Sequence, residues 1–119
     1  MSTTGIPRAV TPGQWSGHDW AGGVQTESLS PFDTLLVRTR NSCYELSFLV
    51  PATGEVLVRG GRFFPVFTPA TLLGSSRRGA QLRVRGIYPG LNLELRRDGQ
   101  TVRTSRIRTV TLAPRPMLH

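Results

Sequence analysis

The sequence predicts an all-β fold, a small antiparallel β-barrel or sandwich of five to seven short strands with one short helical turn and an irregular N-terminal arm. From residue 33 onward, apolar and polar residues alternate with the two-residue period of a strand. Turn signals rich in Gly, Pro, Asn and Asp separate these segments. A chain of 119 residues suits one such domain. We place the domain at residues 33–112, after an arm at 1–32 and before a Pro-containing tail at 113–119.

The N-terminal arm combines a loop-like composition with large aromatic residues. Residues 1–32 are rich in Gly, Ser, Thr and Pro and have neither helical nor strand periodicity. Both tryptophans of the chain, Trp15 and Trp20, lie in this arm. Large aromatic side chains are costly to leave in water, so we expect Trp15 and Trp20 to dock. They would pack either on the barrel of the same chain or on a partner.

The first strands are predicted by clear alternation. In residues 34–40 one face holds Leu35, Val37 and Thr39, and residues 43–50 alternate in the same way. Residues 40–42 suit a tight reversal between these two strands. The motif PATG at 51–54 predicts a second turn, and the next strand follows at 55–59. The apolar face predicted for 43–50 consists of Tyr44, Leu46, Phe48 and Val50.

The stretch VRGGRFFPVF at 58–67 predicts a corner of the barrel. Gly60 and Gly61 suit a bend or bulge, and the phenylalanines are expected to pack inside before Pro65 redirects the chain. The order of basic, Gly and aromatic residues is superficially similar to the octamer of RNA-recognition domains. Pro65 argues against that role, because it lacks the N–H that a paired central strand requires.

The second half of the chain predicts one helical turn and the remaining strands. Thr68 can cap a helical turn, Pro69 fits its first position, and Gly74 can end it. Asp98-Gly99 predicts a two-residue hairpin loop. The strands of this half are expected at 81–87, 91–96 and 101–112.

The charge of the chain is strongly positive and unevenly distributed. All 15 basic residues are arginines, only 7 residues are acidic, and the net charge is +8. Residues 77–119 contain ten of the arginines and only two of the acidic residues. This asymmetry predicts a partner that is a polyanion, such as the RNA or DNA backbone, or an acidic protein surface.

Arginines of the predicted late strands are the candidate polyanion-binding residues. Alternation places two of them on one face of the strand at 81–87 and two more on one face of the strand at 101–112, and others crowd the hairpin between these strands. Guanidinium groups suit the gripping of phosphate or carboxylate. The alternative is a solvated face whose arginines pair with nearby acids. Only Tyr88 lies among these arginines, so the sequence does not predict base stacking. The candidates are Arg83, Arg85, Arg96, Arg103, Arg106 and Arg108.

The sequence does not predict catalysis or a cofactor. The histidines are His18 and His119, far apart in the chain, and Cys43 is the single cysteine, expected as a buried thiol. There is no metal-ligand cluster and no phosphate-cradling loop in the sequence. No run of about 18 apolar residues is present, so we expect no membrane span. Because the sequence has no recognisable secretory signal, we expect a cytoplasmic protein. From the missing catalytic and cofactor motifs, we expect that it is not an enzyme and binds no cofactor.

Two functional hypotheses follow from these features. The first is a non-catalytic β-barrel module that contacts the backbone of nucleic acid through an arginine patch. The second is an accessory or structural subunit of a larger protein assembly, docking through its N-terminal arm and its basic face. The first depends on whether the arginines share one wall of the folded domain.

Overall fold

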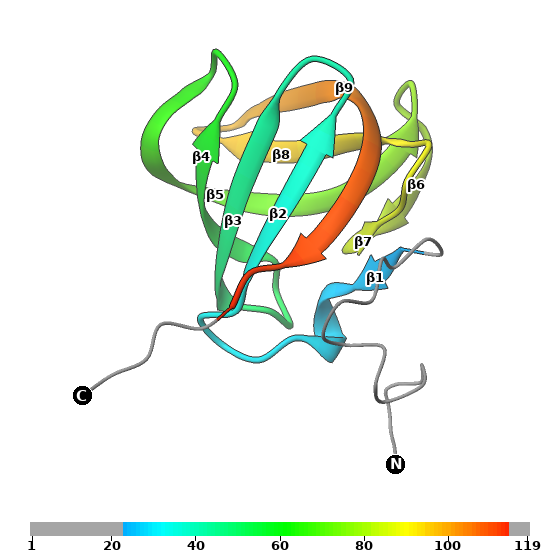
Figure 1. Ribbon diagram of the computed structural model, residues 1–119. Helices are drawn as coiled ribbons and strands as arrows, with labels where there is room; N and C mark the ends of the chain where they lie inside the picture. The colour runs from blue at the N-terminus through cyan, green and yellow to red at the C-terminus, as the bar shows by residue number, and fades with distance from the viewer. Residues whose placement is uncertain (1–22, 115–119) are drawn as a thin grey trace, which may run out of the picture.

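The computed structural model describes residues 23–114 and confirms the all-β fold (Figure 1). Within these residues, no helix has the length and apolar character needed to cross a membrane. One 3-10 turn, η2, joins the first two strands. The elements in chain order are β1 (Val24–Gln25), η2 (Thr26–Ser28), β2 (Thr34–Thr39), β3 (Cys43–Val50), β4 (Glu55–Gly60), β5 (Phe64–Arg77), β6 (Ala80–Val84), β7 (Gly86–Ile87), β8 (Asn92–Arg97) and β9 (Gln100–Leu112).

Six strands close into a ring of antiparallel pairs. The sheet order is β4-β3-β2-β9-β8-β5-β6, and a further pairing between β4 and β5 completes the ring. Strand β5 is 14 residues long and curves through the barrel wall: its first part pairs with β4, and its second part pairs with β8 and β6. Strands β1 and β7 form a separate two-stranded ribbon at one end (Figure 1). A closed ring leaves few free strand edges, which is how small β domains satisfy their backbone groups.

The alternation predicted for the segments that form β2 and β3 is confirmed. Leu35 and Val37 in β2 and Leu46 and Phe48 in β3 are completely buried. Between the strands, the Thr39 N–H donates to the Ser42 carbonyl at 2.8 Å, which closes the predicted reversal. The exception is the last residue of β3, Val50, which is 40% exposed, because the chain leaves the strand there to enter the 51–54 turn.

The Asp98-Gly99 hairpin is also confirmed. Asp98 and Gly99 have φ values of 51° and 78°, and Arg97 pairs with Gln100. Positive φ at both central residues is the signature of a type I′ turn, whose twist matches that of the flanking strands. A second turn of this kind, at residues 78–79, joins β5 to β6 and was not predicted.

The helical turn predicted at residues 68–74 is wrong, because these residues belong to β5. Thr68 pairs with Val58 of β4, and Thr71 pairs with Glu55. A helix at this position would leave the edge of β4 unpaired, so pairing with a neighbour overrides the local capping pattern. The helical turn of the described chain is instead η2, within the segment predicted to be irregular.

The expectation that the three phenylalanines pack inside the barrel is correct for one of them only. Phe64 is fully buried, whereas Phe63 is 49% exposed and Phe67 is 41% exposed. Phe63 lies in the turn between β4 and β5, outside the pleat that directs Phe64 inward. The Phe67 ring lies on the outer surface, 4.3 Å from the guanidinium of Arg59.

Candidate functional site

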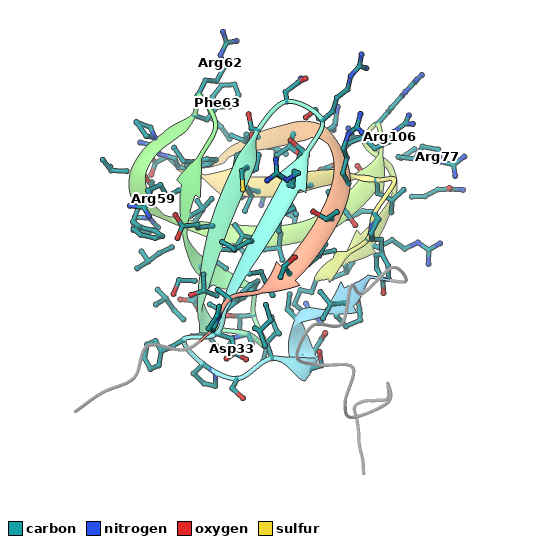
Figure 2. The ribbon with its side chains drawn as sticks, in the orientation of Figure 1. Asp33, Arg59, Arg62, Phe63, Arg77 and Arg106 are labelled. Carbon is teal, nitrogen blue, oxygen red and sulfur yellow. The ribbon has the colours of Figure 1, made fainter. Side chains whose placement is uncertain are left out.

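A continuous basic hollow runs beside the turn between β5 and β6. Its larger part has a volume of about 610 Å³ and its smaller part about 430 Å³. The two parts share Arg78, Asn92 and Arg106, so they form one surface feature, which we call the arginine groove. Figure 2 shows Arg77 and Arg106 projecting on this side of the barrel. The groove is lined by Arg40, Asn41, Arg77, Arg78, Gly90, Asn92, Ser105, Arg106 and Arg108.

One wall of the groove is the turn between β5 and β6, held in place by Asn92. Arg78 has a φ of 53°, and it forms a two-residue turn with Gly79. The Arg78 N–H donates to Oδ1 of Asn92 at 3.1 Å, and Nδ2 of Asn92 donates to the Thr104 carbonyl at 2.9 Å. A single amide side chain therefore ties the turn to β9 and sets the spacing across the groove.

The opposite wall is formed where the turn between β2 and β3 meets β9. The Arg40 N–H donates to the Arg106 carbonyl at 2.9 Å. The Asn41 N–H donates to Oγ of Ser105 at 3.0 Å, and this hydroxyl donates in turn to Oγ1 of Thr39 at 2.8 Å. These bonds bring Arg40 next to Arg106, although the two are far apart in the sequence.

The positive charge of the groove is not neutralised by the described part of the chain. The ion pairs among residues 23–114 are Arg59–Glu45, Arg85–Glu27, Arg97–Asp98 and Arg103–Glu94. None of them involves a groove arginine, and no carboxylate of these residues lines the groove. Asp33 lies at the opposite end of the molecule (Figure 2). Because guanidinium stays protonated at any physiological pH, the groove holds five positive charges.

A third hollow, of about 350 Å³, continues from the groove and brings in aromatic residues. It shares Asn41 and Ser105 with the groove, and its lining includes Tyr44 and Phe63. Tyr44 is 4% exposed, and burial raises the pKa of its hydroxyl above the usual value, while a hydrogen bond with the Ser42 side chain acts in the opposite direction. We call this hollow the aromatic end of the groove.

The six arginines predicted as polyanion-binding residues occupy different places. Arg106 and Arg108 line the arginine groove, and Ile107 between them is buried, as alternation predicts. Arg103 lines the aromatic end, where its Nε donates to Oε2 of Glu94 at 3.2 Å. The other three, Arg83, Arg85 and Arg96, lie outside both.

The three arginines outside the groove have different surroundings. The guanidinium of Arg83 lies 5.8 Å from the Tyr88 ring centroid. Arg85 has a φ of 54°, which separates β6 from β7, and its Nε donates to Glu27 at 3.0 Å. Arg96 lines a separate hollow that also contains acidic residues. The positive φ at Arg85 interrupts the alternation from which a common face with Arg83 was predicted.

Sequence reasoning missed three groove arginines and the exposed Phe63. Arg40, Arg77 and Arg78 lie in or beside turns, outside the late strands from which the candidate arginines were chosen. The local signal at Arg78-Gly79 is weak, because the first position of a type I′ turn favours Asn, Asp or Gly. No local pattern could have placed Phe63 beside the groove, because its neighbours there come from the turn between β2 and β3, from β3 and from β9.

The remaining candidates do not add a chemical site. Cys43 is exposed, so the expectation of a buried thiol is wrong: the inward face of β3 begins at Tyr44 and Cys43 points outward. Residues 23–114 contain no group of three or more His, Cys, Asp or Glu that could hold a metal ion. Trp15, Trp20 and both histidines lie outside the described residues.

Comparison with known proteins does not assign this chain to a family. No protein-family model, no curated protein and no solved structure matches it.

Proposed function

We propose that this chain is a non-catalytic module that binds the phosphate backbone of nucleic acid through the arginine groove. The observation that carries the proposal is the gathering of five arginines from separate segments around one hollow that no described carboxylate lines. A planar guanidinium can donate two parallel hydrogen bonds to one phosphate, so five of them can follow a charged backbone.

The turn residue Arg78 gives this proposal a second support. The first position of a type I′ turn favours Asn, Asp or Gly, because the φ is positive. Arginine at a φ of 53° carries a cost of roughly 1 kcal/mol relative to those residues. The side chain at this position therefore serves the turn poorly, while it adds one charge to both parts of the groove.

The proposal predicts binding that is steeply salt dependent. Each phosphate contact contributes about 0.7–0.9 to the slope of log affinity against log salt concentration. Five contacts would weaken binding by roughly 100- to 500-fold between 50 and 200 mM salt. The assay is fluorescence anisotropy with a labelled oligonucleotide at several salt concentrations.

Two double variants with equal charge test the groove itself. Arg106→Ser/Arg108→Ser removes two groove arginines, and Arg83→Ser/Arg96→Ser removes two exposed arginines outside it. We expect the first pair to lower the salt slope by about 1.5 and the second to leave it nearly unchanged. Equal losses from both pairs would show that only the net charge matters, and the proposal would fail.

Arg78→Asn separates binding from folding. Asn-Gly is the favoured pair for this turn, so the free energy of unfolding of the variant should rise by roughly 0.5–1 kcal/mol. Its melting temperature should rise accordingly. Its affinity for the oligonucleotide should fall, and its salt slope should drop by about 1.

A competition experiment with poly-glutamate tests the kind of partner. Displacement of the oligonucleotide from the wild-type protein at equal charge concentration would favour an acidic protein surface as the partner instead.

The second hypothesis, an accessory subunit of a larger assembly, stays a prediction. It depends on Trp15 and Trp20 of the N-terminal arm, which lie outside the described residues.

A further inference from the structure

We propose that the ligand of the groove is single-stranded nucleic acid, with one unpaired base stacked on the ring of Phe63. This inference rests on the proposed function, because the arginine groove supplies the backbone contacts. The new element is the aromatic end, which adjoins the groove through Asn41 and Ser105. It places an aromatic ring next to the row of guanidinium groups.

The turn that carries Phe63 is braced from two sides. Nη1 of Arg97 donates to the Phe63 carbonyl at 3.2 Å. On the other side Gly61 lies against the Tyr44 ring, so closely that a Cβ there would come within 2.9 Å of its Cε1 atom. The backbone of the turn is thus held, while the Phe63 side chain extends outward next to Arg62 (Figure 2).

The exposure of Phe63 makes its ring available to a ligand. The ring is 49% exposed, and the core is filled by its neighbour Phe64, so the fold does not require a phenylalanine at position 63. A large aromatic residue on a constrained turn can stack on a flat apolar group with little loss of conformational freedom. Beside a basic groove, the matching flat group is a nucleobase.

An unpaired base is required for this contact. In a duplex both faces of each base are stacked on neighbouring bases, and only the edges face the grooves. Single-strand binders combine a positively charged channel that follows the backbone with aromatic side chains that stack on bases. The arginine groove and Phe63 reproduce this combination, with Arg62 adding a further cation at the aromatic end.

The test compares a 12-nucleotide oligo(dT) strand with a 12-base-pair duplex, each labelled with fluorescein. We expect the wild-type protein to bind the single strand more tightly than the duplex at the same salt concentration. Phe63→Ala and Phe63→Leu should each weaken binding to the single strand by about 10-fold or more, because neither has a π face. Phe63→Trp should retain the affinity of the wild type.

The control variant is Phe67→Ala. Phe67 is exposed to a similar extent, at 41%, but its ring lies against Arg59 and outside the aromatic end. It should bind the single strand like the wild type. Circular dichroism of each variant checks that the domain is folded, and the retained affinity of Phe63→Trp covers the case in which Phe63→Ala unfolds.

The outcomes separate this inference from the proposed function. Equal affinity for duplex and single strand, or Phe63→Leu with unchanged affinity, would overturn the stacking inference while backbone binding stands. Loss of binding in Arg106→Ser/Arg108→Ser but not in Phe63→Leu would have the same meaning. If the wild-type protein binds neither nucleic acid at 50 mM salt, the proposed function itself is overturned.

Discussion

Replacing Phe64 by alanine should be among the most damaging single changes to this fold. Phe64 and Phe48 are the two largest fully buried side chains among residues 23–114. Phe64 begins β5 and pairs with Gly60, where the barrel turns the corner from β4. Truncation of a buried phenylalanine costs about 3–5 kcal/mol, through lost burial and the cavity left behind. That is a large share of the roughly 5–15 kcal/mol by which a domain is stable.

Urea unfolding followed by circular dichroism measures this loss. With an m value of about 2 kcal/mol/M, a loss of about 4 kcal/mol lowers the midpoint by about 2 M. The matched control is Phe63→Ala at the adjacent position. Its side chain is 49% exposed, and the Arg97 bond to its carbonyl does not involve the ring. We expect that variant to lose about 1 kcal/mol or less.

The two variants together test the register of β5. Residues 63 and 64 have the same side chain and neighbouring positions, so composition and hydrophobicity cannot distinguish them. Only the register of β5 assigns Phe64 to the core and Phe63 to the surface. Equal midpoints for Phe63→Ala and Phe64→Ala, or a larger loss for Phe63→Ala, would show that this register is wrong.

Two further predictions concern the backbone and the alkaline limit of stability. Gly74→Ala should lower the free energy of unfolding by about 3 kcal/mol or more, because φ is 142° and a Cβ there would overlap the Arg83 carbonyl. Gly99→Ala should lower it by only about 1–2 kcal/mol, because φ is 78° and the space around this residue is open. Urea midpoints measure both, and equal losses would contradict the close approach of β5 and β6. Burial raises the pKa of Tyr44 above 10.0, so as the pH rises past about 10 the unfolded chain releases this proton before the folded chain does, and the free energy of unfolding falls. Tyr44→Phe should flatten this decline between pH 9 and 11, in a chain that has no lysine to titrate there, and an unchanged slope would contradict it.

The sequence pattern was sufficient to predict the parts of the fold that depend on neighbouring residues in the chain. Strict alternation predicts the burial of Leu35 and Phe48, and the residue pair Asp98-Gly99 predicts a turn because both residues accept positive φ. Strand β5 has no such signal. It contains two prolines, Pro65 and Pro69, and its alternation is broken by bulges, so its strand character depends on pairing with β4, β8 and β6.

The candidate site was predictable only in part, for a related reason. Arg106 and Arg108 follow from the alternation of one strand, and both line the groove. Arg40 and Arg78 reach it through turns that the folded chain brings beside β9, and sequence spacing carries no information on that approach. Phe63 joins the same surface by closure of the ring, which is a property of the whole barrel.

Closure of the ring also determines when the barrel can first exist during synthesis. The strand that closes it is β9, the last strand of the described residues, which must pair with β2, the first strand of the ring. Leu35 pairs with Leu112, and the Ala113 N–H donates to the Thr34 carbonyl at 2.8 Å. A nascent chain that ends before residue 100 therefore has two open seams, along β2 and β8, and carries the backbone groups of both unpaired. The arginine groove, which needs residues 105, 106 and 108, is therefore assembled only when β9 closes the ring.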